Sequence, residues 1–371
     1  MIKYLGSKRR LVPSIASIAR AVGTRQALDL FTGTTRVAQA LKRDGAQVTA
    51  VDSASYSNVL ARTYVAADRA AVDGNELAAA LAELASLPPR RGYVTRVFCE
   101  QSRYFHPDNG ERIDAVRDAI EERYAGSLLY PILLTSLLEA ADRVDSTTGL
   151  QMAYLKQWAP RALKPLELRV PALIDGSGVA LQADALEAAA SGDLGEFDLA
   201  YLDPPYNQHR YFSNYHVWET LVRWDAPDHY GIACKRVDCK EPSSHSPFNR
   251  RASMAGALAA VVAGVQASLV VVSYNDEAWL ALEDLVDMCS RRGHVAVLAF
   301  DSKRYVGAQI GIHSPSGVKV GSVSHLRNTE IMVISGSREL VEAATAAGAT
   351  SATGASTVDG REPARIGLVP Q

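Results

Sequence analysis

Residues 26–52 read QALDLFTGTTRVAQALKRDGAQVTAVD, and this stretch decides the fold class. The apolar run at 26–31 is typical of a buried strand, and it ends in the small-residue turn FTGTT. A helical pattern follows over 37–43 and ends at Gly45, after which AQVTAVD (46–52) predicts a second strand. Strand, turn, helix and strand of these lengths form a βαβ unit, so we expect an α/β protein with a parallel sheet.

The remaining chain predicts helices in the middle and strands towards the end. Residues 74–170 carry helical patterns broken by LPPRRGY and FHPDNGE, and we interpret them as a mostly helical insertion. Residues 225–251 are polar and predict a long surface loop, and residues 307–324 predict a hairpin. Residues 336–371 are rich in small residues, and we expect a flexible tail. Further strands are expected at 179–184, 197–203, 268–274, 294–300 and 328–335.

The composition is that of an ordinary globular chain. Of its 371 residues, 47% are hydrophobic and 22% are charged, which excludes a mainly disordered or collagen-like protein. No apolar run approaches the ~20 residues of a membrane span, and no signal peptide is recognised, so we expect a cytoplasmic protein without membrane contact. The four cysteines are too few for a disulfide framework. The net charge of −2 still permits a nucleic-acid partner, because local charge matters more than the sum.

The strongest chemical signal is the tetrapeptide Asp203, Pro204, Pro205 and Tyr206, which follows an apolar strand. Ligands of open α/β sheets bind beyond the carboxyl ends of the strands. Neither proline donates a hydrogen bond, so the peptide offers the Asp203 carboxylate and the Pro204 carbonyl as acceptors beside the ring of Tyr206. Such a site suits a planar ligand with an NH2 group, for example a nucleobase rotated out of a duplex. The alternative is a plain proline-rich turn.

A second signal is the loop DLFTGTT at residues 29–35, followed by Asp52 at the end of the next strand. A small-residue loop lets the backbone approach a ligand, and an acid after the next strand can bind two ribose hydroxyls. A dinucleotide motif would need three glycines and only Gly33 is present, so a nucleoside cofactor is the better interpretation. An ordinary connection, with Asp52 capping the following helix, is the alternative.

The N-terminal sequence KYLGSK, at residues 3–8, supplies an aromatic ring and cations. Tyr4 can lie against a sulfonium cation through cation–π attraction, and Lys8 can pair with a carboxylate of the same ligand. A basic, solvated terminus is the alternative.

The order KYLGSK, DLFTGT, VD and DPPY resembles the Dam-like, alpha-group adenine-N6 DNA methyltransferases. The resemblance extends over about residues 1–335, since VVSYND (271–276) and NTEIMVIS (328–335) also resemble later strands of this family. It implies a Rossmann-like methyltransferase sheet that uses S-adenosylmethionine. The catalytic domain would then consist of residues 1–73 and 171–335, with 74–170 as an inserted target-recognition domain.

The resemblance also implies roles for single residues. Asp203 to Tyr206 match the catalytic tetrapeptide, in which Asp203 and the Pro204 carbonyl accept the amine protons of a flipped adenine while Tyr206 stacks on it, so that the methyl group transfers directly. The family's loop usually reads F-x-G-x-G, and Thr35 replaces the second glycine here, so its Cβ is expected to crowd the cofactor. The implied cofactor-binding residues are Tyr4, Lys8, Asp29, Phe31, Gly33, Asp52 and Asp184.

Contact with double-stranded DNA requires local cations. We expect the helical insertion to read the base sequence and the 235–251 part of the loop to hold phosphates. The candidate cations are Arg90, Arg91, Arg96, Lys235, Arg236, Lys240, Arg250 and Arg251. The Cys and His residues of the loop have the wrong spacing for the usual metal sites, so we expect no metal. A cognate restriction endonuclease is a further expected partner.

Two other classes of function stay open at this point. One is a methyltransferase that acts on RNA or on a protein amide, and such relatives often carry Asn in place of Asp203. The other is a non-catalytic DNA-binding relative, against which the presence of Asp203 and Lys8 argues.

Overall fold

The computed structural model describes residues 2–6, 8–206, 208, 210–275, 278–303, 312–313, 319–321, 327–350 and 355–359. The chain forms two compact units, each assembled from segments that are distant in the sequence. The first unit contains residues 1–7, 32–184 and 209–246, and the second contains residues 8–31, 185–208 and 247–371. In the described part of the chain, no helix is both long and apolar enough to cross a membrane.

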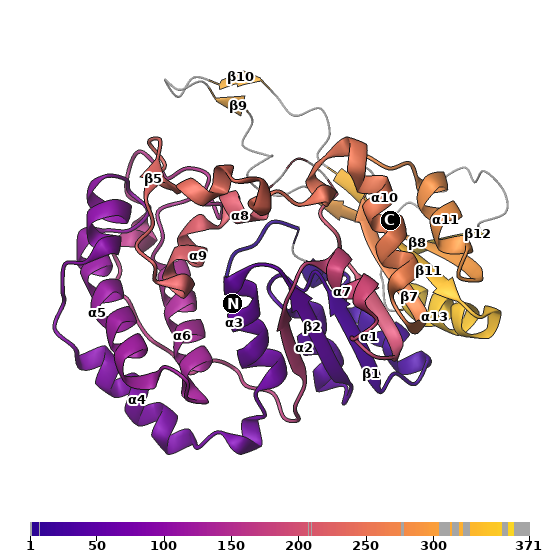
Figure 1. Ribbon diagram of the computed structural model, residues 1–371, viewed down its shortest axis with the longest axis horizontal. Helices are drawn as coiled ribbons and strands as arrows, with labels where there is room; N and C mark the ends of the chain where they lie inside the picture. Colours follow the sequence, from indigo (N-terminus) through magenta and orange to yellow (C-terminus); the bar gives the residue numbers. More distant parts are fainter. Residues whose placement is uncertain are drawn as a thin grey trace. The chain divides into compact units, whose positions relative to one another are not determined.

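The second unit is built on a sheet with the strand order β12-β8-β11-β7-β4-β1 (Figure 1). Strands β1, β4 and β7 are parallel, whereas β11 is antiparallel to β7 and β8, and β12 is antiparallel to β8. The strand bounds are β1 (Gln26–Leu30), β4 (Phe197–Leu202), β7 (Ala267–Asn275), β8 (His294–Lys303), β11 (Arg327–Gly336) and β12 (Ala355–Asp359). A separate antiparallel pair, β9 (Ile312–His313) and β10 (Lys319–Gly321), lies within the expected hairpin, whose remaining residues are outside the described ones.

The register of the parallel strands positions the tetrapeptide. Leu30 of β1 lies opposite Leu202 of β4, which lies opposite Val272 of β7, and all three side chains are buried. These strands are near-continuous apolar runs because both of their faces are covered. The tetrapeptide therefore begins, at Asp203, immediately beyond the carboxyl end of a central buried strand.

The helices of the second unit pack in two groups. Helix α1 packs on α13, and α10 packs on α7 and α11. Their bounds are α1 (Val12–Ala21), α7 (Ala185–Ser191), α10 (Arg251–Gly264), α11 (Leu282–Ser290) and α13 (Arg338–Thr350), with the 3-10 turns η1 (Lys8–Arg10) and η8 (Pro247–Asn249).

Helix α13 corrects the expectation of a flexible tail from residue 336. Its Val341 and Ala344 are fully buried, and a Cβ on Gly348 would lie 2.6 Å from Leu298 Cδ1. Small side chains let this helix approach α1 and β8 closely, so the buried face carries little of the apolar bulk by which a sequence pattern is recognised.

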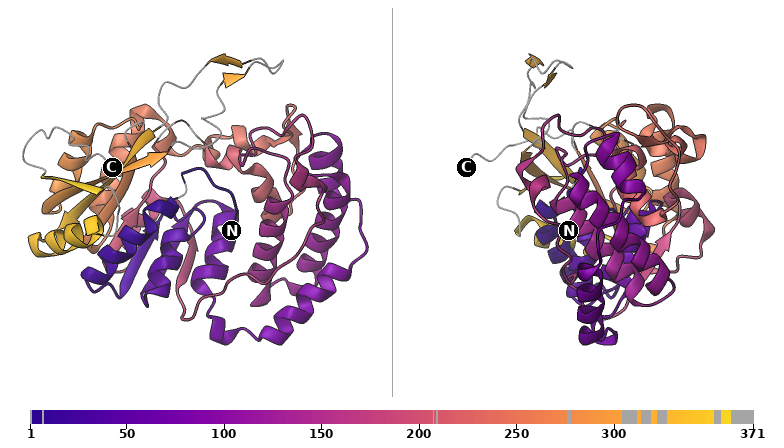
Figure 2. Two further views of the ribbon diagram at one scale, coloured as in Figure 1. Left: turned by 180° about the vertical axis from the view of Figure 1, so that it is seen from behind. Right: turned by 90° about the vertical axis from the view of Figure 1, so that its left-hand side faces the viewer.

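The first unit is mostly helical around one parallel strand pair, β2 (Gln47–Asp52) and β3 (Val179–Gln182). Helices α4, α5 and α6 follow one another in the purple and magenta part of the chain, with α5 packed on both α4 and α6 (Figure 2). Its helices are α2 (Arg36–Arg43), α3 (Ser55–Ala61), α4 (Gly74–Ser86), α5 (Pro107–Tyr124), α6 (Leu129–Arg143), α8 (Tyr211–Asn214) and α9 (His216–Arg223). The short segments are the π-helical turns η2 (Arg62–Ala66) and η4 (Thr95–Glu100), the 3-10 turns η3 (Arg69–Ala71), η5 (Pro160–Leu163), η6 (Val237–Lys240) and η7 (Pro242–Ser244), and the hairpin strands β5 (His229–Tyr230) and β6 (Lys235–Arg236).

The two units divide the chain differently from the domains expected from the sequence. The helical stretch 74–170 belongs to the same unit as residues 32–73 and 209–246. The reason is packing, because α3 contacts both α6 and α9 within one hydrophobic core. That core includes Tyr56 from α3, Leu134 from α6 and Trp218 from α9.

Candidate active site

The tetrapeptide of the second unit lies next to a buried lysine and a second acid. The Lys8 ammonium is 3.2 Å from Asp203 Oδ1 and 3.1 Å from Glu330 Oε2. Its side chain is 6% exposed, whereas those of Asp203 and Glu330 are 20% and 19% exposed. We call Lys8, Asp203, Tyr206 and Glu330 the DPPY cluster. From the sequence we expected Lys8 to pair with a carboxylate of the ligand. In the structure its ammonium pairs with the side chains of Asp203 and Glu330.

The electrostatics of this cluster leave Asp203 weakly stabilised as an anion. Burial raises the pKa of Asp203 to about 6, since the nearby Lys8 ammonium only partly offsets the loss of water and Glu330 adds a like charge. Burial alone would lower the pKa of Lys8, but Asp203, Tyr206 and Glu330 bring it well above the ordinary value. At neutral pH the cluster therefore holds an ionised acid whose proton affinity is close to the working range.

Tyr206 provides the aromatic component of the same cluster. Lys8 Nζ lies 5.4 Å from its ring centroid, and the ring meets that of Tyr274 edge to face at 5.4 Å. The Tyr206 carbonyl accepts a hydrogen bond from the Trp279 amide at 3.4 Å. Burial raises the pKa of Tyr206 to about 12, so its hydroxyl remains protonated at neutral pH.

The first unit holds a second cluster, which we call the glycine-loop cluster: Tyr4, Gly33, Asp52 and Ser57. Asp52 Oδ2 accepts a hydrogen bond from the Gly33 amide at 2.8 Å, and Oδ1 accepts one from the Ala54 amide at 2.9 Å. The Ser57 hydroxyl donates to the Gly33 carbonyl at 2.6 Å. Burial raises the pKa of Asp52, although both amide donors favour the charged form. The carboxylate of Asp52 therefore fixes the loop that contains Gly33 to the turn that follows β2.

Tyr4 lies directly over Gly33. A Cβ built on Gly33, whose φ is +52°, would be 3.0 Å from Tyr4 Cε1. The Tyr4 ring also stacks on Tyr215 at 4.8 Å and on Tyr211 at 5.3 Å. Glycine is required here for two reasons, the left-handed backbone and the contact with the ring.

Thr35 occupies the position at which the family pattern has a second glycine. Its φ of 61° and ψ of 17° are left-handed, a conformation that β-branched residues rarely adopt. The side chain is fully buried, and its Oγ1 donates to the Thr34 carbonyl and accepts from Gln39 Nε2 at 2.8 Å. The backbone therefore keeps the conformation that a glycine would favour, and local hydrogen bonds hold the threonine in it.

The remaining expected cofactor residues are divided between the two units. Asp184 comes directly after Ala183, whose amide donates to the Asp52 carbonyl at 3.1 Å in the first unit. Asp29 is buried in β1, opposite Tyr201 of β4, in the second unit. Phe31, with a φ of 69°, meets the ring of Phe248 edge to face at 5.0 Å, also in the second unit.

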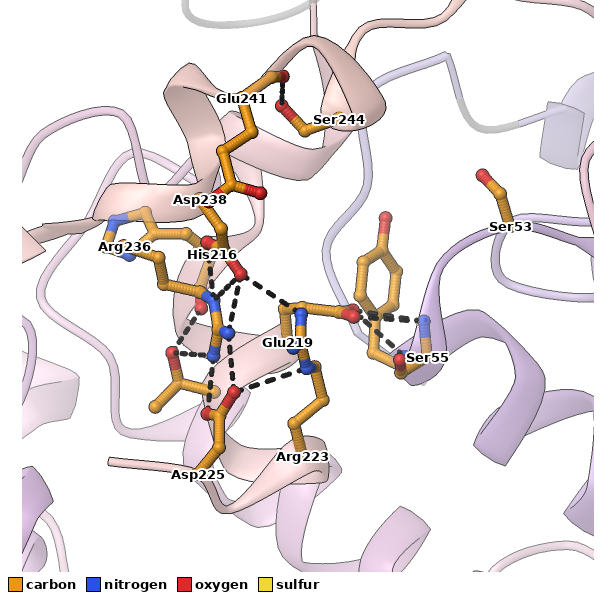
Figure 3. Close-up of polar contacts among 12 residues, drawn as sticks. Ser53, Ser55, His216, Glu219, Arg223, Asp225, Arg236, Asp238, Glu241 and Ser244 are labelled. Atoms are coloured by element: carbon orange, nitrogen blue, oxygen red, sulfur yellow. Dashed lines mark hydrogen bonds and ion pairs between the residues drawn. The ribbon is translucent and has the colours of Figure 1, made fainter. Parts of the chain in front are cut away.

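Arg236 is the one proposed DNA-binding residue that the structure contradicts. Its side chain is 2% exposed and lies between Asp225 and Asp238 (Figure 3). The guanidinium donates to both oxygens of Asp225, at 2.7 and 2.6 Å, and to Asp238 at 2.8 Å. Successive residues of a strand face opposite sides, so β6 turns Arg236 inwards and leaves Lys235 half-buried at the surface.

The other candidate cations reach the surface. Arg91 forms a bidentate ion pair with Glu100, at 2.8 and 2.6 Å, and Arg90 pairs with Asp118. Lys240 Nζ lies 3.8 Å from the Tyr230 ring centroid. The exposed members of the set are Arg90, Arg91, Arg96, Lys240, Arg250 and Arg251.

Sequence reasoning missed two acids, one partly buried and one fully buried. Glu330 interrupts the apolar pattern at the start of β11, and this isolated acid in a strand was the available signal. Glu219 of α9 is 2% exposed and accepts hydrogen bonds from the Ser55 amide at 3.0 Å and the Tyr56 amide at 3.4 Å (Figure 3). It thereby caps the N-terminus of α3, and nothing local in the sequence marks it. Within the described residues, no group of three or more His, Cys, Asp or Glu side chains could hold a metal ion.

Comparison with known proteins decides the family. The model of the D12 class N6 adenine-specific DNA methyltransferases matches residues 4–288, which include both clusters except Glu330. The chain belongs to this family. It is therefore an N6-adenine DNA methyltransferase. The two alternative functions, a methyltransferase of RNA or a protein amide and a non-catalytic DNA-binding relative, are not favoured.

Individual relatives agree with this assignment. The type II methyltransferase M.NlaIII of Neisseria lactamica is 32% identical over 323 residues, which cover 82% of this chain and 92% of that protein. The modification methylase StsI of Streptococcus sanguinis is 30% identical over 313 residues, covering 77% of this chain and 46% of that protein. The type II methyltransferase M.CviAII of Paramecium bursaria Chlorella virus 1 is 32% identical over 218 residues, 58% of this chain and 64% of that protein. The mixed α/β structure is consistent with the Rossmann-like fold expected of methyltransferases.

Proposed function

We propose that the DPPY cluster orients the exocyclic amine of a flipped adenine for direct methylation. The supporting observation is the position of Asp203, beyond the carboxyl end of β4, with a side chain that is 20% exposed. Because its pKa is about 6, Asp203 is an acceptor at neutral pH. Asp203 and the Pro204 carbonyl accept the two N–H bonds of the amine. This directs the nitrogen lone pair at the methyl group, and the Tyr206 ring stacks on the base.

S-adenosylmethionine, when bound, supplies a methyl group carried on a sulfonium sulfur. We assign its ribose to Asp52 and its adenine to the neighbourhood of Asp184, with Tyr4 over Gly33 closing the loop. The residue types fit such a ligand, because Asp52 is a carboxylate at the end of β2 and Gly33 adds no side chain to the neighbouring backbone. Asp29, Phe31 and Lys8 remain proposed cofactor contacts on the strength of the family resemblance.

We propose that double-stranded DNA is held by surface cations and read by the helical stretch 74–170. Arg90, Arg91 and Arg96 lie in the early part of this stretch, and Lys235, Lys240, Arg250 and Arg251 belong to the 225–251 loop. Arg236 is not part of this set. The names of the relatives also support a role beside a cognate restriction endonuclease.

Methyl-transfer assays test the catalytic proposal. Tritiated S-adenosylmethionine is incubated with DNA, RNA and protein, and the methylated DNA is digested to nucleosides. We expect label in N6-methyladenine from DNA alone. Asp203→Ala should lower the transfer rate by about 1,000-fold or more, with cofactor affinity within about threefold of the wild type. A variant that keeps a tenth of the wild-type rate would refute the role of Asp203.

Salt-dependent binding tests the DNA contacts. Lys240→Ala should weaken DNA binding by about three- to tenfold and reduce the slope of log K against log salt by about 1, since one phosphate contact is lost. Arg69→Ala is the matched control, because Arg69 is an exposed cation that pairs with Asp175 and is not one of the proposed DNA contacts. Equal slopes for wild type and Lys240→Ala would remove Lys240 from the interface.

A further inference from the structure

We propose that Glu330 is a positioning residue for the methyl-transfer reaction, which holds the Lys8 ammonium so that one oxygen of Asp203 stays available to the substrate amine. The inference rests on the proposed role of Asp203. Neither the family match, which ends at residue 288, nor the sequence motifs assign Glu330 a role.

The geometry places one cation between two anions. Lys8 Nζ is 3.1 Å from Glu330 Oε2 and 3.2 Å from Asp203 Oδ1, both within ion-pair distance. The three groups come from three separate segments: η1, the end of β4 and β11. In β11, Glu330 lies opposite Asn275 of β7 and Phe300 of β8, so two neighbouring strands fix its backbone. A surface ion pair would be free to move, but this lysine is 6% exposed and confined.

Competition for Lys8 decides what Asp203 can bind. A lysine ammonium is a compact charge with three donors and no directional fork, so with a single acid as partner it can settle across both carboxylate oxygens. The pull of Glu330 keeps it on Oδ1. Asp203 then turns its second oxygen to the substrate amine, which donates an N–H bond to it.

The same arrangement balances charge during the reaction. The nitrogen forms a bond to the methyl carbon, the carbon–sulfur bond breaks, and its electron pair stays on sulfur. The methylated nitrogen then releases one proton, and Asp203 takes it. Once Asp203 is protonated, the buried Lys8 ammonium would have no anion beside it if Glu330 were absent. The Glu330 carboxylate balances the charge of Lys8 at that moment.

The pH–rate profile distinguishes this role from a merely structural one. Removing the charge of Glu330 and removing the charge of Lys8 should shift the profile in opposite directions. The charged or titratable groups near Asp203 are Lys8, Glu330, Tyr201 and Tyr206, with Asp29 facing Tyr201. Glu330→Gln removes a negative charge beside Asp203, so the acidic limb of the pH–rate profile should move to lower pH. Lys8→Met removes the positive charge, so the limb should move to higher pH.

The experiment measures single-turnover methyl transfer to a duplex substrate from pH 5 to pH 9, together with equilibrium binding of S-adenosylhomocysteine and DNA. Glu330→Gln should lower the plateau rate by about tenfold or more with both affinities unchanged, and Glu330→Asp should recover part of it. Glu342→Gln is the control and should match the wild type, because this side chain of α13, in the same unit, is 64% exposed.

A plateau rate for Glu330→Gln within twofold of the wild type, or limbs that do not move in opposite directions, would overturn the inference. Asp203→Ala separates this failure from failure of the proposed function. If Asp203→Ala is inactive while Glu330→Gln is normal, only the role of Glu330 falls. If Asp203→Ala is active, the proposed function falls as well.

Discussion

Two buried cations of this enzyme each lie between two carboxylates, yet the environments of the acids differ. In the second unit Lys8 lies between Asp203 and Glu330, at 3.2 and 3.1 Å. In the first unit Arg236 lies between Asp225 and Asp238, with pairs of hydrogen bonds as short as 2.6 Å (Figure 3). Burial raises the pKa of Asp203 to about 6, but the pKa of Asp225 is lowered, because the hydrogen bonds from Arg236 outweigh the effect of burial.

The comparison distinguishes a cluster available for chemistry from a cluster that fixes structure. The guanidinium is a rigid fork that satisfies both oxygens of Asp225, and Arg223 adds a further contact at 3.3 Å. The Lys8 ammonium is a single point charge shared with a like-charged neighbour of Asp203. Asp203 therefore keeps a raised pKa in a partly exposed position, which suits the role proposed for it, whereas Asp225 holds the 225–251 loop against α9.

The largest stability effect is expected at Arg236. Arg236→Ala leaves Asp225 and Asp238 without their buried partner, so the free energy of unfolding should fall by about 3 kcal/mol. Arg223→Ala removes a cation whose side chain is 41% exposed, and it should cost less than about 1 kcal/mol. Urea denaturation of both variants measures the difference. If both variants lost the same free energy of unfolding, the buried ion pairs of Arg236 would not have the structural role that we assign to them.

A smaller effect is expected at the strained loop. Thr35→Gly should change the free energy of unfolding by less than about 1 kcal/mol, because relief of left-handed strain offsets the lost side-chain contacts and the added entropy of the unfolded chain. Gly33→Ala is the contrasting variant, since its Cβ would be 3.0 Å from the Tyr4 ring at a φ of +52°. It should destabilise the protein and weaken cofactor binding. A loss of several kcal/mol in Thr35→Gly would mean that the threonine contacts dominate.

The sequence predicted the parts of the fold that local patterns encode. The βαβ stretch agrees with β1, α2 and β2 to within one residue at most ends, because the apolar runs and the small-residue turn are contiguous. The tetrapeptide lies where a strand pattern followed by prolines predicted it, at the end of β4. Helices α4, α5 and α6 also agree with the predicted helical stretch.

The features that the sequence did not predict depend on contacts between distant segments. Arg236 is buried because a two-residue strand turns it towards Asp225, eleven positions away, and the sequence KRVDCK alone suggests an exposed charge run. Glu330 meets Lys8 across 322 positions. Helix α13 is recognised only through close packing of Ala and Gly, which carries a weak hydrophobic signal.

The most direct test of the account is the pH dependence of single-turnover methyl transfer by the wild-type enzyme. When Asp203 is protonated, the carboxyl oxygen that carries the proton cannot accept a hydrogen bond from the substrate amine. The rate should therefore fall as the pH drops through about 6, with the slope of one titrating group. The same fall in rate at low pH should persist in Asp225→Asn, since Asp225 is not part of the DPPY cluster. A rate that stays constant from pH 8 down to pH 5 would contradict the assignment of Asp203 as the group that receives the amine.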